Sequence, residues 1–221
     1  MSVWALLPVK RLQGAKARLS DILSEEERSA LARAMLLDVI AALKAANRVD
    51  VVALVTDDED AIQIAQDNGC QAIAEPELKG LNPALSHGLS HAISKGATSA
   101  LILHGDVPLA KAEEIDELVG FVQGVYSVAI GTAASDGGTN GMALCPPDCL
   151  PLMYGVDSAA KHVTAADDLE LLVTHLEMDG LGLDIDQPED LQAFLERAEQ
   201  GHTLDYLLAT GLDKRLKERT T

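Results

Sequence analysis

The sequence predicts one α/β domain of the doubly wound kind, a three-layer sandwich with a mostly parallel sheet and a late antiparallel addition. Strand-like and helix-like segments alternate over residues 1–120, and 48% of the 221 residues are hydrophobic. Polar motifs also follow directly after apolar runs. Alternation of this kind is typical of a parallel sheet covered on both faces, and the length fits one domain. Ligands of such sheets bind at the carboxyl ends of the strands, so the site is expected there.

The first half of the chain predicts regularly alternating elements. Short apolar runs predict strands over residues 4–8, 49–56, 70–74 and 99–104. Helices are expected over about 24–46, from 57 or 58 to about 69, 83–95 and 110–121. Ser24 and Glu27 have the spacing of a capping box, and Pro83 is well placed to open a helix.

The second half is less regular. Strands are expected over 126–131, 142–145, 170–177 and 181–185, with a short helix over 158–162 and a longer one from Pro188 to 199. These strands lack regular intervening helices, which predicts the antiparallel addition. No linker divides the chain, so a single domain over residues 1–212 is expected. The charged tail, 213–221, is expected to fray.

Composition excludes several classes of function. Lysine and arginine number 17 against 35 acids, a net charge of −18, which disfavours nucleic acid and anionic membranes as partners. No signal peptide and no run of about 20 apolar residues is visible, so a cytoplasmic protein is expected. Cys70, Cys145 and Cys149 lack a second close pair, and reduced structural thiols are expected.

The acidic chain has one basic segment. Residues 1–20 hold Lys10, Arg11, Lys16 and Arg18 and no acid. Either the segment binds an anion, or the clustering is chance on a solvated face, and composition alone gives the two equal weight. The loop of residues 9–19 follows the first strand, where phosphates commonly sit, yet it lacks the phosphate-loop and dinucleotide fingerprints.

Three carboxylates follow predicted strands. Asp106 comes after the strand at 99–104, and Asp184 and Asp186 close the strand at 181–185. Residues i and i+2 of a strand point to one side, so the three could converge on Mg²⁺, which prefers oxygen ligands. The alternative is that Asp186 caps the helix opened by Pro188 and Asp106 shapes a turn. Because both Asp106 and Asp186 follow predicted buried strands, the metal site is favoured over this alternative.

Two further motifs offer polar atoms. Residues 137–141 are rich in glycine and include Thr139 and Asn140, which fits either a ligand contact or a hairpin turn. Ser158 stands near a helix start, a position that suits phosphate or carboxylate, with His162 one turn later. The alternative is a plain helix cap with a surface histidine.

In combination, LLPVKRLQGAKARLS, GLNPAL, HGDVPL, DGGTNGMAL, YGVDSAAKH and LDIDQPEDL resemble the CofC/FbiD family of guanylyltransferases of coenzyme F-420 biosynthesis. The resemblance runs from about residue 3 to 195. It implies a nucleotidyltransferase fold, GT-A-like and Rossmann-like, and transfer of GMP from GTP to 2-phospho-L-lactate, phosphoenolpyruvate or 3-phospho-D-glycerate with release of pyrophosphate. It also implies a homodimer.

Motif by motif, the resemblance implies roles for residues of this chain. Lys16 and Asp106 would be catalytic, and Mg²⁺, with Mn²⁺ as the alternative, would be held by Asp106, Asp184 and Asp186. The residues implied to bind GTP are Pro8, Lys10, Gly14, Lys16, Arg18, Leu81 and Asn82. Those implied to bind the acid are Thr139, Asn140, Gly155 and Ser158.

The motifs depart from the family at two places. His104 and Gly105 stand where a Pro-Ala or similar pair is expected, and Val156 and Asp157 replace a more usual Pro-Gly. The second change adds a negative charge beside the implied acid pocket, so it bears on substrate identity. The alternatives are a molybdopterin or sugar-phosphate nucleotidyltransferase, and an inactive nucleotide-binding module. The first usually has paired glycines in the opening loop, and the second would be expected to lose the carboxylates.

Overall fold

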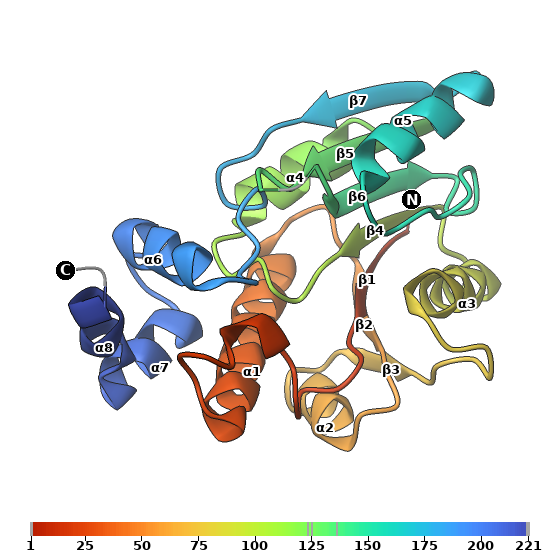
Figure 1. Ribbon diagram of the computed structural model, residues 1–221. Helices are drawn as coiled ribbons and strands as arrows, with labels where there is room; N and C mark the ends of the chain where they lie inside the picture. Colours follow the sequence, from red (N-terminus) through yellow and green to blue (C-terminus); the bar gives the residue numbers. More distant parts are fainter. Residues whose placement is uncertain (1, 123, 125, 136, 220–221) are drawn as a thin grey trace.

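A computed structural model describes residues 2–122, 124, 126–135 and 137–219 and contains a seven-stranded sheet with helices on both faces (Figure 1). The strands are β1 (Val3–Pro8), β2 (Val51–Val55), β3 (Gln71–Ile73), β4 (Ser99–Leu103), β5 (Ser127–Thr132), β6 (Thr139–Cys145) and β7 (Leu172–Leu176). Their order in the sheet is β3-β2-β1-β4-β6-β5-β7. Within the described sheet, β6 alone runs antiparallel to its neighbours, β4 and β5. The predicted antiparallel addition is therefore confirmed as one strand inserted into a parallel sheet.

Helices cover the two faces and make the three predicted layers. They are α1 (Glu25–Ala45), α2 (Glu59–Asp67), α3 (Leu81–Ser94), α4 (Ala112–Gly120), α5 (Ser158–Asp168), α6 (Pro188–Arg197), α7 (His202–Thr210) and α8 (Leu212–Arg219), with a 3-10 turn, η1 (Ala17–Leu19). Successive residues of β1 point to opposite faces, so Ala5 and Leu7 pack with α1, α2 and α4 while Leu6 packs with α3 and α5. No helix in the described ranges has both the length and the apolarity that crossing a bilayer would need.

Local signals in the sequence start several helices as expected. Ser24 Oγ accepts from the Glu27 amide at 3.2 Å while Glu27 Oε2 accepts from the Ser24 amide at 2.8 Å, which is a capping box. Asp58 caps α2, and Pro188 is the first residue of α6. The third helix begins at Leu81 rather than Pro83, so Leu81 and Asn82 are helical. All three cysteines are free thiols, as expected.

The strand predicted over residues 181–185 does not exist. This segment crosses the carboxyl ends of the central strands instead of joining the sheet. Its backbone hydrogen bonds are scattered contacts and do not form a strand ladder. The Gly182 amide donates to Met178 O at 2.8 Å, which closes a turn, and the Ile185 amide donates to Asp106 O at 3.0 Å. The apolar run at 181–185 is buried by this crossing, which is why it resembled a strand.

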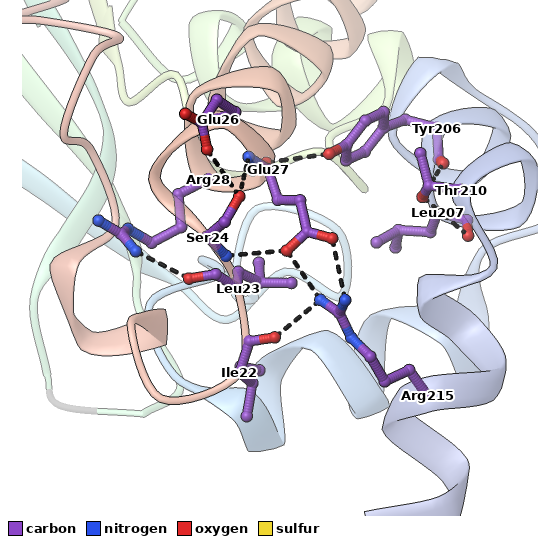
Figure 2. A network of polar contacts seen from close by, with 10 residues as sticks. All are labelled: Ile22, Leu23, Ser24, Glu26, Glu27, Arg28, Tyr206, Leu207, Thr210 and Arg215. Carbon is purple, nitrogen blue, oxygen red and sulfur yellow. Dashed lines mark hydrogen bonds and ion pairs between the residues drawn. The ribbon is translucent and has the colours of Figure 1, made fainter.

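The expectation of a fraying tail is also wrong for the described residues, although residues 220–221 lie outside them. Helix α7 packs against α1, α8 packs against α6 and α7, and Leu212 is buried at the start of α8 (Figure 1). In Figure 2 both terminal nitrogens of Arg215 donate to the Glu27 carboxylate, each at 2.9 Å, and Tyr206 Oη donates to Glu27 O. The charged tail is thus bound, through Arg215, to Glu27 of the capping box of α1.

Arg215→Ala is expected to lower the free energy of unfolding by about 1 kcal/mol. The bidentate geometry strengthens the ion pair, but its partial exposure to solvent keeps the contribution small. For a chain of this size that corresponds to a fall in Tm of about 2–4 °C. Thermal melting followed by circular dichroism measures it, with the exposed neighbour Lys214→Ala as the charge-matched control. Equal melting of the two variants would contradict a fastening role for Arg215.

Candidate functional site

The Lys16 ammonium lies at the centre of the site, at the carboxyl ends of β1 and β4. Its Nζ donates to Asp106 Oδ2 at 2.6 Å and to Asp186 Oδ1 at 2.8 Å. The lysine backbone is left-handed, with φ of 53°, and its side chain is only 9% exposed. One cation therefore bridges two carboxylates that are 80 positions apart in the chain, 186 minus 106.

Asp186 faces the basic loop and does not cap a helix. Arg18 Nη1 donates to Asp186 Oδ2 at 3.3 Å. Gln187 is the N-cap residue of α6, and Asp190 Oδ2 accepts from the amides of Asp186 and Gln187. The alternative in which Asp186 is only a helix cap is therefore wrong.

Asp184 lies beside the other two carboxylates on a different support. Asn140 Nδ2 donates to Leu181 O at 2.9 Å and to Asp184 Oδ1 at 3.3 Å. Asn140 is 4% exposed, and it follows Thr139 in β6, so the two side chains leave opposite faces of the strand. Asn140 therefore contacts Asp184, on the carboxylate side of the site, and its side chain points away from that of Thr139.

The charges at this point are strongly coupled. Burial alone would raise the pKa of Asp106, but the Lys16 ammonium outweighs it and holds that pKa below its usual range. Burial lowers the pKa of Lys16, and the charges of Asp106 and Asp186 more than reverse this, so its pKa is raised. Asp184 has its pKa raised by burial and by the negative charges of Asp106 and Asp186. The surroundings of Asp184 therefore disfavour its charged form, and a nearby cation would stabilise it.

A cavity of about 270 Å³ opens beside Lys16 between the basic loop, α1 and the start of α3. Pro8, Lys10, Lys16 and Leu81 line it, as the family resemblance implies for the nucleotide. Gly14 and Arg18 do not line it. The lining residues that the sequence did not single out as ligand contacts include Ala32, Met35, Leu36 and His104.

Asn82 has a different environment from the one implied by the resemblance. Its Nδ2 donates to Tyr154 O at 3.2 Å, and its Oδ1 accepts from the Tyr154 amide at 2.9 Å. Both ends of the amide are used to hold this loop. The Tyr154 ring lies 5.0 Å from that of His162 and 5.3 Å from that of His104, measured between centroids. This ring contact could not be read from the sequence, because His104 lies far along the chain from Tyr154 and His162.

The two hydroxyls expected to bind the acid lie together. The Thr139 amide donates to Ser158 Oγ at 2.9 Å, and Ser158 Oγ lies 3.2 Å from Thr139 Oγ1. His162 Nδ1 is 3.1 Å from Thr139 Oγ1, and His162 is fully buried, so the alternative of a surface histidine is wrong. Gly155, with φ of 135°, has open space where a side chain would be, at the turn that leads into α5.

The carboxylates are not arranged as a ready metal centre. Across residues 2–122, 124, 126–135 and 137–219, no three His, Cys, Asp or Glu side chains are grouped so as to hold a metal ion. The Lys16 ammonium fills the point between Asp106 and Asp186. Asp106 Oδ1, however, is buried with no hydrogen-bond partner, so one carboxylate oxygen at the site is left unsatisfied.

The family model and the similar proteins of known name all point to guanylyltransferases. A family model described as "Guanylyl transferase CofC like" matches residues 3–221. A phosphoenolpyruvate guanylyltransferase of Conexibacter woesei is 39% identical over 220 residues, covering 95% of this chain and 98% of that protein. A 2-phospho-L-lactate guanylyltransferase of Methanothermobacter thermautotrophicus is 32% identical over 207 residues, covering 94% and 90%.

Solved structures agree on the fold. A crystal structure described as a nucleotide-diphospho-sugar transferase, from Desulfovibrio desulfuricans, aligns with a TM-score of 0.81 at 20% identity, covering 99% of this chain and 98% of that one. At this identity the likeness speaks for the fold alone. It confirms the predicted nucleotidyltransferase fold.

Proposed function

Because the chain belongs to the CofC-like guanylyltransferase family, we propose that it transfers GMP from GTP to a small phosphorylated carboxylic acid and releases pyrophosphate. Phosphoenolpyruvate is the first acid to test, since a relative at 39% identity carries that name. 2-phospho-L-lactate and 3-phospho-D-glycerate are the alternatives. The resemblance is also the ground for proposing a role in coenzyme F-420 biosynthesis and a homodimer, and the cytoplasmic location expected from the sequence remains a proposal.

The observation that carries this proposal is the Lys16 ammonium, which lines the cavity of about 270 Å³ and contacts Asp106 and Asp186, and we propose that this cavity is the nucleotide cavity. The acid's phosphate carries close to two negative charges at neutral pH, so it needs no general base. Its oxygen forms a bond to the α-phosphorus of GTP while the bond from that phosphorus to the bridging oxygen breaks, and pyrophosphate leaves with the electron pair. The obstacle is repulsion between two anions, which Lys16 and Arg18 would reduce.

The residues at the site fit a divalent cation. Asp106, Asp184 and Asp186 supply only oxygen donors, which Mg²⁺ and Mn²⁺ accept, and the unpartnered Asp106 Oδ1 is available. We propose that these three hold the metal, which supplies charge neutralisation for the triphosphate. The Lys16 ammonium now satisfies two of the same carboxylates, so it would be freed for phosphate when a cation competes for them.

Pyrophosphate release from GTP tests the proposal. The purified enzyme with Mg²⁺ is assayed against phosphoenolpyruvate, 2-phospho-L-lactate and 3-phospho-D-glycerate, each with GTP and with ATP. We expect release with one or more acids and a higher kcat/KM for GTP than for ATP. Release with none of the acids would overturn the proposed reaction, and a clear ATP preference would overturn the assignment of the base.

Ser158→Ala is expected to raise KM for the acid by about tenfold or more, because a hydrogen bond to a charged group contributes about 1.5–3 kcal/mol. The GTP KM should barely change, since the nucleotide cavity is lined by other segments. Asp157, not Ser158, is the N-cap residue of α5, so the helix start survives the change.

The Thr139 amide loses its acceptor in this variant, so thermal melting must accompany the kinetics. Ser90→Ala, at an exposed hydroxyl in α3, is the control. A variant that raises the GTP KM and leaves the acid KM unchanged would show that the two ends of the site are assigned the wrong way round.

A further inference from the structure

His162 is held in one orientation from three sides. Its Nε2 accepts from the Met153 amide at 2.9 Å, and its Nδ1 lies 3.1 Å from Thr139 Oγ1. The Tyr154 ring makes a T-shaped contact with it, with an interplanar angle of 71°. The residue is fully buried in the first turns of α5. The ring therefore cannot exchange one nitrogen for the other without breaking these contacts.

These contacts fix the tautomer of the ring. A backbone amide only donates, so His162 Nε2 must carry a lone pair toward Met153. Neutral imidazole has one N–H, which is then on Nδ1 and donates to Thr139 Oγ1. A cationic ring would place a donor against the Met153 amide. Burial also lowers the pKa of His162 to about 4, which keeps the ring neutral at physiological pH.

The tautomer decides where the hydroxyl hydrogens go. Thr139 and Ser158 have two hydroxyl hydrogens, and the 3.2 Å contact between the oxygens uses one of them. With Nδ1–H donating to Thr139 Oγ1, no acceptor is offered by His162, so one hydroxyl hydrogen remains for a ligand. With the other tautomer, Thr139 would donate to Nδ1 and Ser158 to Thr139, and both hydrogens would be consumed inside the protein.

Open space lies next to the two hydroxyls, one of which keeps a hydrogen that is not used inside the protein. Gly137 and Gly155 flank the hydroxyl pair, since Gly137 O accepts from the Ala159 amide and Gly155 O accepts from the Ser158 amide. A side chain at either glycine would meet no heavy atom within 4 Å. The two glycines therefore leave open space next to the hydroxyl pair.

We propose that His162 is a positioning residue that turns the Thr139–Ser158 pair into a hydrogen-bond donor for the acid substrate. The proposal rests on the proposed function, in which this pair holds the phosphorylated acid. His162 itself touches no substrate. It acts by donating to Thr139 Oγ1, which forbids the arrangement in which the pair keeps both of its hydrogens.

The tautomer is measured without any substrate. Enzyme labelled with ¹⁵N in its six histidines is studied by two-bond ¹H–¹⁵N correlation at neutral pH, and His162 is assigned by its loss in His162→Gln. We expect Nδ1 to be protonated and Nε2 unprotonated. Protonation on Nε2, or on both nitrogens, overturns the proposal.

A matched pair of substitutions tests the consequence. The amide of His162→Asn reaches the place of Nδ1 and can still donate to Thr139, whereas that of His162→Gln reaches the place of Nε2 and serves only Met153. We expect His162→Gln to raise the acid KM about tenfold, His162→Asn to stay within about threefold of wild type, and the GTP KM to change in neither.

Equal rises of the acid KM in both variants, or a rise of the GTP KM, would mean that His162 only packs, which overturns the proposal. Thermal melting confirms that both variants are folded at the assay temperature. Failure of the wild-type enzyme to use any acid would overturn the proposed function instead, and the NMR result would still decide the tautomer on its own.

Discussion

Asp186→Asn is expected to lower kcat by on the order of a thousandfold at saturating Mg²⁺, equivalent to about 4 kcal/mol of transition-state stabilisation. The Asp186 carboxylate takes no part in capping α6, because Gln187 and Asp190 do that. Its contacts are with Lys16 and Arg18, both of which we propose to act on phosphate. The loss should therefore be one of catalysis. Because Asp186 is 40% exposed, the change in Tm should be small.

The control is Asp67→Asn, which makes the same charge change at an exposed position near the end of α2. Steady-state kinetics with both substrates saturating separate a fall in kcat from weaker binding. Wild-type turnover in Asp186→Asn would exclude this carboxylate from the proposed metal site. A fall in turnover that matches the control would reduce its role to general electrostatics.

The layers of the fold could be predicted because hydrophobic periodicity is a local property. The run at residues 4–8 and the capping box at Ser24 and Glu27 both act within a few residues, and the structure confirms them. The segment at 181–185 shows the limit of such reasoning. Its apolar residues are buried by a crossing over the strand ends, and burial alone does not distinguish that from a strand.

The convergence of Asp106, Asp184 and Asp186 was expected from alternation along a strand. In the structure, contacts with distant segments hold these residues in place instead. The Ile185 amide is bound to Asp106 O, and Asn140 holds Asp184 from β6. Long-range contacts of this kind leave no local pattern. The same holds for Arg215, whose partner Glu27 lies at the other end of the chain, and it explains why a tail expected to fray is ordered.

Lys16→Met is expected to reduce kcat/KM by about a hundredfold or more, since it removes the cation that we propose to offset developing phosphate charge. It should also destabilise the protein by about 1–3 kcal/mol near pH 7.5, because the Asp106 side chain, which is only 27% exposed, would lose its charged partner. In the wild type the pKa of Asp106 is lowered, so its contribution to stability is present above the usual carboxyl pKa and is lost as pH falls.

Without Lys16 the sign of this dependence reverses. Burial and the neighbouring carboxylates would then raise the pKa of Asp106, so the variant should be least stable relative to wild type at neutral pH and should recover as acid protonates the carboxyl. Melting temperatures of both proteins from pH 5 to pH 8, with Lys95→Met as an exposed control, measure the difference. A deficit in Tm that stays constant over this range would contradict the ion pair as the source of the lost stability, because simple loss of packing does not titrate.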